Sequence, residues 1–154
     1  MKIKKILGVL FTSMLLLTMS SSVFAADVTP NAVGIGDSRT NAITLLDNTM
    51  YTLFISDAND KDWYKWTNNT GKDRYVSATL YPTAPGTSLN LSAIIDYGGG
   101  IETSVLHGER SVPTNGMRFR NLYVPNGASL YVIIGNDLST LTQYDFNILS
   151  GSVN

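Results

Sequence analysis

The chain has 154 residues, with 11 Lys and Arg against 12 Asp and Glu, a single His and no Cys. The lack of cysteine excludes disulfides, a thiol nucleophile, thiolate metal sites and a lipidated N-terminal cysteine. The length suits one domain with a real core. The few basic residues are not clustered enough to predict nucleic acid or an anionic membrane surface as a partner.

Residues 1–25 have the pattern of a secretory signal peptide. Three lysines within the first five positions precede an apolar run over residues 6–19, and Val23 and Ala25 fit the cleavage rule. The alternative is a retained membrane anchor, but the run is shorter than the roughly 20 residues needed to span a bilayer. We expect cleavage after Ala25 or the next alanine, no membrane insertion afterwards, and a secreted protein. Without the three lysines, eight basic residues face twelve acidic ones.

The remaining chain predicts an extended lead-in over residues 26–41 and a β-sandwich over residues 42–154. The lead-in is rich in Gly, Pro, Asn and Asp. In 89–97, Leu and Ile alternate with polar residues, as in a half-buried strand, and 130–134 is apolar on both faces, as in a central strand. Similar strand patterns occur in further segments, namely 50–55, 62–67, 74–81, 118–124 and 144–148.

Turn signals separate these segments, and no convincing helical period follows the signal peptide. Asn115-Gly116 and Asn126-Gly127 tolerate positive φ, and Gly98 to Gly100 ends the strand that precedes it. About eight strands at intervals of ten to fifteen residues predict a single all-β, antiparallel sandwich or barrel.

Four short motifs occur in a recognisable order along the chain. They are Asp60 to Trp66 (DKDWYKW), Leu89 to Leu91 with Asp96 to Gly98, Val124 to Gly127 before Leu130 to Val132, and Tyr144 to Phe146. Together they resemble the bacterial pre-peptidase C-terminal domain family, whose members are similar to the collagen-binding domains of clostridial collagenases. The resemblance covers about residues 40 to 149 and implies a jelly-roll-like β-sandwich. In that family the domains are appendages, and some bind calcium or collagen.

The motifs depart from the family pattern at several points. Trp66 stands where Phe is usual, Leu130 replaces one of two adjacent tyrosines, and Asp96-Tyr97 inverts the usual Tyr-Asp order. Family members usually trail a secreted protease, whereas here the expected signal peptide and lead-in come before the domain.

The turn before the first motif is a candidate calcium loop. Asp57, Asn59, Asp60 and Asp62 supply carboxylate and amide oxygens, of which Ca²⁺ prefers six to eight. The EF-hand pattern fails, because a lysine stands where a third ligand belongs and the loop glycine is missing. The family resemblance favours calcium and implies Asp37 in the lead-in as a further ligand. The alternative is that these residues are ordinary turn formers that bond to local backbone.

Three aromatic residues are candidate ligand contacts. Alternation in the strand after the turn places Tyr64 and Trp66 in the core and Trp63 outside. Tyr123 and Tyr131 are the other candidates; Tyr131 matches the family pattern, although a core position also suits it.

The sequence offers little catalytic chemistry. His107 is the only histidine, and Ser104, Ser111 and Glu109 lie near it without a nucleophile elbow or another local signature. Glu102 and Glu109 are the only glutamates, and nothing fixes their separation for glycoside hydrolysis. We therefore expect a protein without enzymatic activity.

These observations predict a secreted, non-catalytic module that binds an extracellular polymer or protein, with calcium as a candidate stabilising ion. Two alternatives remain open. One is a partner, inhibitor or chaperone-like domain for a separately encoded secreted enzyme. The other is a matrix or surface protein that self-associates through strand edges. The pattern leaves the ligand and the oligomeric state open.

Overall fold

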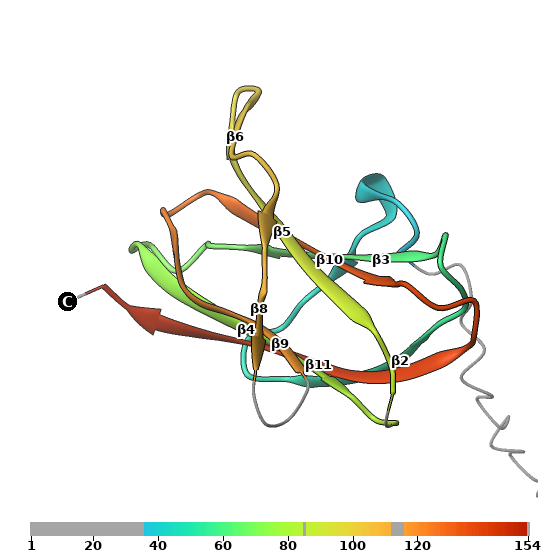
Figure 1. The fold of residues 1–154 in the computed structure, drawn as a ribbon. Helices are drawn as coiled ribbons and strands as arrows, with labels where there is room; N and C mark the ends of the chain where they lie inside the picture. The colour runs from blue at the N-terminus through green and yellow to red at the C-terminus, as the bar shows by residue number, and fades with distance from the viewer. Residues whose placement is uncertain (1–35, 85, 112–115, 154) are drawn as a thin grey trace, which may run out of the picture.

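The computed structural model describes residues 36–84, 86–111 and 116–153, and within these ranges the chain forms two packed sheets (Figure 1). Sheet A has the order β1 (Ile43–Thr44), β3 (Lys61–Thr67), β10 (Ser129–Asn136), β5 (Leu89–Gly98) and β6 (Ile101–Glu102), with β7 (Leu106–His107) also paired to β5. Sheet B has the order β2 (Met50–Ile55), β11 (Thr142–Ser152), β4 (Arg74–Pro82), β9 (Gly116–Val124) and β8 (Glu109–Ser111).

The predicted all-β antiparallel sandwich is confirmed. Each of the seven segments with a strand pattern forms a strand, and β10 lies between β3 and β5 as a central strand should. Every pairing among the described strands is antiparallel except that of β1 with β3. Gly98, which ends β5, and the two glycines after it have φ of 84°, 63° and 82°, which confirms the turn expected there.

Some expectations differ from the structure or lie outside it. The signal peptide, most of the lead-in and Asn115 fall outside the described residues. Within the lead-in, Arg39–Asn41 form one 3₁₀ turn (η1), so this part is not fully extended. The described residues contain no helix long and apolar enough to cross a membrane.

The core forms between the sheets because each long strand alternates. In β4, Val76, Ala78 and Leu80 are fully buried, while their neighbours face outward. In β10, Leu130 and Val132 are likewise buried against them. Full burial of one such Val or Leu side chain contributes about 1.5–3 kcal/mol.

Successive long strands alternate between the two sheets. The chain passes from β2 in sheet B to β3 in sheet A, and this exchange continues through β4, β5, β9, β10 and β11. Between β5 and β9, the segment that contains β6, β7 and β8 follows the edge of β5 and then crosses to sheet B (Figure 1). This connectivity places segments far apart in sequence side by side on each outer face.

A buried polar network joins the two sheets. Asp62 and Tyr64 come from β3, and Tyr144 comes from β11 on the opposite sheet. The Tyr144 hydroxyl donates to the Asp62 carboxylate, and the hydroxyl oxygens of Tyr64 and Tyr144 are 2.5 Å apart. Because a phenol has one proton, Tyr64 is the donor to Tyr144. The network supplies a buried carboxylate with a hydrogen bond that water would otherwise make.

Replacing Tyr144 with Phe removes that donor and keeps the ring. We expect Tyr144→Phe to lower the free energy of unfolding at neutral pH by about 2–3 kcal/mol, since a buried charged acceptor loses its partner. Urea denaturation measures this change. Tyr81→Phe is the control, because Tyr81 is exposed on the same sheet; an equal loss in both variants would contradict a special role for the network.

Candidate functional site

The lead-in and the β1 strand that follows it are held against β3. The Trp63 amide donates to the Gly36 carbonyl at 2.6 Å, and further along Ile43 pairs in parallel with Tyr64. Gly36 has φ of 87°, and a Cβ atom there would lie 3.1 Å from the Trp63 carbonyl oxygen. This close approach favours glycine and brings Asp37, the next residue, to the start of β3.

Three carboxylates meet at this point. Oxygens of Asp37, Asp60 and Asp62 all lie within 4.8 Å of one another. Asp60 also accepts the Ser56 amide at 2.7 Å, which fixes its side chain across the turn. An all-oxygen set of negative groups suits a hard divalent cation, so these three residues could hold a metal ion.

Burial and charge make Asp62 the unusual member of this group. Its pKa is raised to about 6, mainly by burial; the Tyr144 hydrogen bond acts to lower it, and the nearby Asp60 and Asp37 carboxylates contribute to the rise. The same burial raises the pKa of Tyr144 and of Tyr64. A cation beside Asp62 would therefore relieve an electrostatic cost that the metal-free protein carries.

The other two expected ligands lie outside this carboxylate group. The Asp57 side chain accepts the Asn59 amide at 2.8 Å, and the Asp57 carbonyl accepts the Asp60 amide at 3.3 Å. These are the local bonds of an ordinary turn. Asp57 and Asn59 thus shape the loop that presents Asp60, whereas Asp37 and Asp62 join Asp60 in the cluster.

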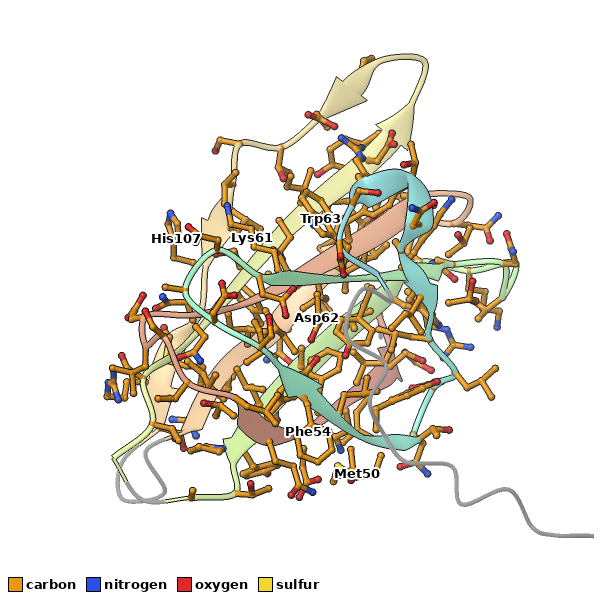
Figure 2. The ribbon with its side chains drawn as sticks, turned by 90° about the vertical axis from the view of Figure 1, so that its right-hand side faces the viewer. Met50, Phe54, Lys61, Asp62, Trp63 and His107 are labelled. Atoms are coloured by element: carbon orange, nitrogen blue, oxygen red, sulfur yellow. The ribbon has the colours of Figure 1, made fainter. Side chains whose placement is uncertain are left out.

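The three candidate aromatics do not share one surface. Trp63 is half-buried on the outer face of sheet A, on the opposite side of β3 from Asp62 (Figure 2). Tyr131 lies on the same face but is only 8% exposed, because the Arg39 guanidinium covers its ring at 4.4 Å. Tyr123 lies on sheet B, where its ring meets Tyr75 edge-on at 5.9 Å.

These positions make the three aromatics unequal as candidates for contact with a ligand. Arg39 is held over Tyr131 by ion pairs to Asp96 at 2.9 Å and to Glu102 at 2.7 Å, so the Tyr131 ring is not available as an exposed contact. Tyr131 is buried, in line with the other expectation for it, although it is not part of the cluster between the sheets. The Tyr123 hydroxyl donates to Asp73. Trp63 is the candidate that opens onto a hollow.

The hollow has a volume of about 450 Å³ and lies on the outer face of sheet A. Its apolar lining comes from Trp63, Ile94, Ile133, Val105 and Ala58. Its polar lining comes from Asp60, Lys61, Asn90, Ser92, His107, Asn136 and Asp137, and Gly135 completes it. Figure 2 shows Lys61 between Trp63 and His107 in the view onto this side.

Strand register explains why these residues meet. Trp63 of β3 lies opposite Ile133 of β10, which lies opposite Ser92 of β5, which lies opposite His107 of β7. Directly opposed residues share a face of a sheet. The alternation of β5 predicted that Asn90 and Ser92 share its polar face. The sequence did not show that this face lies beside Trp63, because that depends on how β3, β10 and β5 pair.

The only histidine of the chain has a different serine partner from those expected. His107 Nδ1 is 3.3 Å from Ser92 Oγ, whereas Ser104, Ser111 and Glu109 make no hydrogen bond to it in the described part of the chain. A serine nucleophile needs a histidine that is oriented by a third group. Among the described residues, no carboxylate bonds to this ring.

Comparisons with known proteins agree with the fold. No protein-family model matches the chain, and no curated protein sequence matches it. The crystal structure of the pre-peptidase C-terminal domain of collagenase from Bacillus anthracis matches with a TM-score of 0.53 at 12% identity, covering 70% of this chain and 93% of that one. The Yersinia pseudotuberculosis-derived mitogen matches with a TM-score of 0.49 at 18% identity, covering 71% and 91%. The resemblance inferred from the four motifs is thereby confirmed for the fold.

The raised pKa of Asp62 predicts how stability depends on pH when no metal is bound. The folded protein holds this proton up to about pH 6, and the unfolded chain releases it near 3.8, so the stability gained by protonation is present in acid and is lost as the pH rises through 6. The loss amounts to roughly 3 kcal/mol.

Asp62→Asn keeps an acceptor for Tyr144 and removes the titration. We expect its stability to be flat between about pH 4 and 7, and higher than that of the unmodified protein at the upper end. Thermal unfolding in chelator across this range measures both. A variant with the same pH profile as the unmodified protein would contradict a buried, titrating Asp62.

Proposed function

We propose that the protein is a secreted, non-catalytic module that binds an extracellular polymer or protein through the outer face of sheet A. The observation that carries this proposal is the hollow beside Trp63, whose exposed surface is mainly apolar although seven of its lining residues are polar. Binding sites for small ligands have this composition and volumes of about 300–1,000 Å³. The pre-peptidase C-terminal domain with the same fold belongs to a collagenase, which supports a binding role.

A non-catalytic role fits the chemistry of the site. His107 and Ser92 lie at the rim of the hollow and are both accessible. In the part of the chain that the structure describes, no carboxylate bonds to His107 to orient it as in a serine hydrolase. The residues at the hollow are suited to contact a ligand and not to transform it.

We further propose that the carboxylate group binds calcium. Asp37, Asp60 and Asp62 would hold the ion, and the chemistry of calcium there is to neutralise the three carboxylates. Asp37 and Asp60 come from segments on either side of β1 and β2, so an ion between them would fasten the lead-in to the start of β3. Because Trp63 follows Asp62 directly and its amide bonds to Gly36, calcium would also stiffen one side of the hollow.

Calcium should raise the melting temperature through these three residues. An ion present at about 100 times its Kd stabilises the folded state by about 2.7 kcal/mol. We expect Asp37→Asn to abolish most of the gain, since it removes an exposed ligand without disturbing the core. Asp57→Asn is the matched control and should keep the full gain in melting temperature. If only that variant loses the gain, calcium binds at the turn around Asp57, and the assignment to Asp37, Asp60 and Asp62 is wrong.

Trp63 should carry a large share of polymer binding. We expect Trp63→Ala to weaken retention on the bound polymer at least about tenfold, as truncation of an aromatic anchor does. Tyr123→Ala, on the other sheet, should leave retention unchanged. The measurement is a depletion isotherm on insoluble collagen, peptidoglycan, chitin and cellulose.

The same isotherms test the proposal as a whole. Retention that both variants keep would contradict the assignment to sheet A. Absence of retention on all four polymers, together with concentration-dependent assembly in solution, would replace this proposal with self-association.

A further inference from the structure

Gly135 is the last but one residue of β10, the central strand of sheet A, and the geometry of the strand does not require a glycine there. Its pairing with Lys61 on one side and Asn90 on the other is regular, so no bulge occurs there. Its φ lies outside the left-handed region, and a Cβ atom built on it would meet no other heavy atom within 4 Å. Glycine inside a strand lowers stability. Where neither strain nor crowding requires it, glycine marks a place that a ligand approaches closely.

The missing side chain helps to form the hollow. Alternation along β10 turns Ile133 and Gly135 to the outer face. Because Gly135 has no side chain, the position next to Ile133 on this face is open space. That space lies between Lys61 and Asn90, the strand partners of Gly135. Trp63, the partner of Ile133, borders it from the next row of the sheet.

The two sides of this space differ in chemistry. On the β3 side, the Trp63 ring is apolar and continues onto Ile133 of β10, with Lys61 and Asp60 at its end, and Ile94 adds apolar surface from β5. The other side presents hydrogen-bonding groups of Asn90 and His107. A ligand that fills it therefore needs one apolar face and one edge that both donates and accepts.

The polar side is positioned in advance. The Asp137 carboxylate accepts hydrogen bonds from the Asn90 amide and from the Ser88 hydroxyl, the latter at 2.9 Å. Because the Asn90 nitrogen is engaged in this way, its amide oxygen is left to accept from a ligand. His107 is held through Nδ1 by Ser92, which leaves Nε2 without a partner among the described residues.

The charges of the rim select against an anion. Asp60 and Asp137 place two carboxylates at the hollow, and Lys61 is the single lysine or arginine in its lining. An acidic ligand would be repelled by Asp137, and also by Asp60 when no calcium ion neutralises it, whereas a neutral ligand meets no such repulsion. Hydroxyl groups supply both donors and acceptors without charge.

We propose that a neutral sugar ring of a polysaccharide binds over Gly135, with its C–H face on Trp63 and its hydroxyls toward Asn90 and His107. This inference rests on the proposed function and names its ligand class. The hollow is open to solvent on the outer face of sheet A, so one ring of a longer chain can enter it. A protein polymer would use the same face without the need for a glycine.

Gly135→Val tests the inference directly. Valine suits a strand and fits the open space, so the variant should fold with an unchanged or higher melting temperature. We expect its affinity for a neutral oligosaccharide to fall at least about tenfold, because the branched side chain occupies the position of the sugar. Gly151→Val is the matched control: Gly151 lies in β11 on sheet B, and its nearest atom beyond a built Cβ is 3.9 Å away.

The probes are hexasaccharides of glucose and of N-acetylglucosamine, an acidic polygalacturonate fragment, and a collagen peptide, each in calorimetry and in competition with the retained polymer. Binding of a neutral hexasaccharide that Gly135→Val loses and Gly151→Val keeps is the expected result. A second outcome is that the protein is retained on collagen, no sugar displaces it, and Gly135→Val does not weaken the retention. This result overturns the sugar inference but leaves the proposed function standing. Preference for the acidic fragment also overturns it. Absence of binding to every probe and polymer overturns both.

Discussion

The hydrogen bond from Tyr144 to Asp62 crosses between the two sheets, and much of the structure depends on it. A carboxylate at the start of a core strand would be costly if it lacked a donor. Tyr144 supplies the donor from β11, and Tyr64 supports Tyr144 in turn. The bond therefore fixes β3 relative to the opposite sheet at the end where the lead-in joins.

The same strand gives the molecule its two functional features. Successive residues of a strand point to opposite faces, so Asp62 faces the core and the carboxylate group while Trp63 faces the hollow. The main chain between them bonds to Gly36 of the lead-in. A change in the charge of Asp62 is thus one residue away from the aromatic surface that we assign to the ligand. Ion binding and ligand binding would be coupled through this rigid strand and need no conformational switch.

Much of the fold could be predicted, because long strands with one buried face carry their period in the sequence. Leu89–Gly98 and Arg74–Pro82 are examples. The segment from β6 to β8 could not, since strands of two or three residues are defined by pairing along the edge of β5 and carry no period of their own. The outward position of Trp63 followed from alternation alone.

The rest of the site depends on distances between segments far apart in sequence. Gly135 and His107 join Trp63 only through the register of four strands. Tyr131 has the right residue type and the right face, yet Arg39 of the lead-in covers it. The sequence alone does not show which aspartates of the turn join Asp37. In the structure Asp57 bonds to the local backbone instead, and Asp60 is the residue of the turn that joins the carboxylate group.

The ligand could bind on the outer face of sheet A or on that of sheet B, and the two possibilities can be distinguished directly. Sheet A presents the hollow, and sheet B presents the edge-on pair of Tyr75 and Tyr123. The most direct measurement is amide chemical-shift mapping of the ¹⁵N-labelled protein in a buffer that contains calcium. The titrant is a soluble fragment of the polymer on which the protein is retained. The expected result is a continuous set of shifted amides in β3, β5 and β10 that is centred on Gly135. Shifts confined to β4 and β9 around Tyr123 would contradict the assignment of the ligand to sheet A.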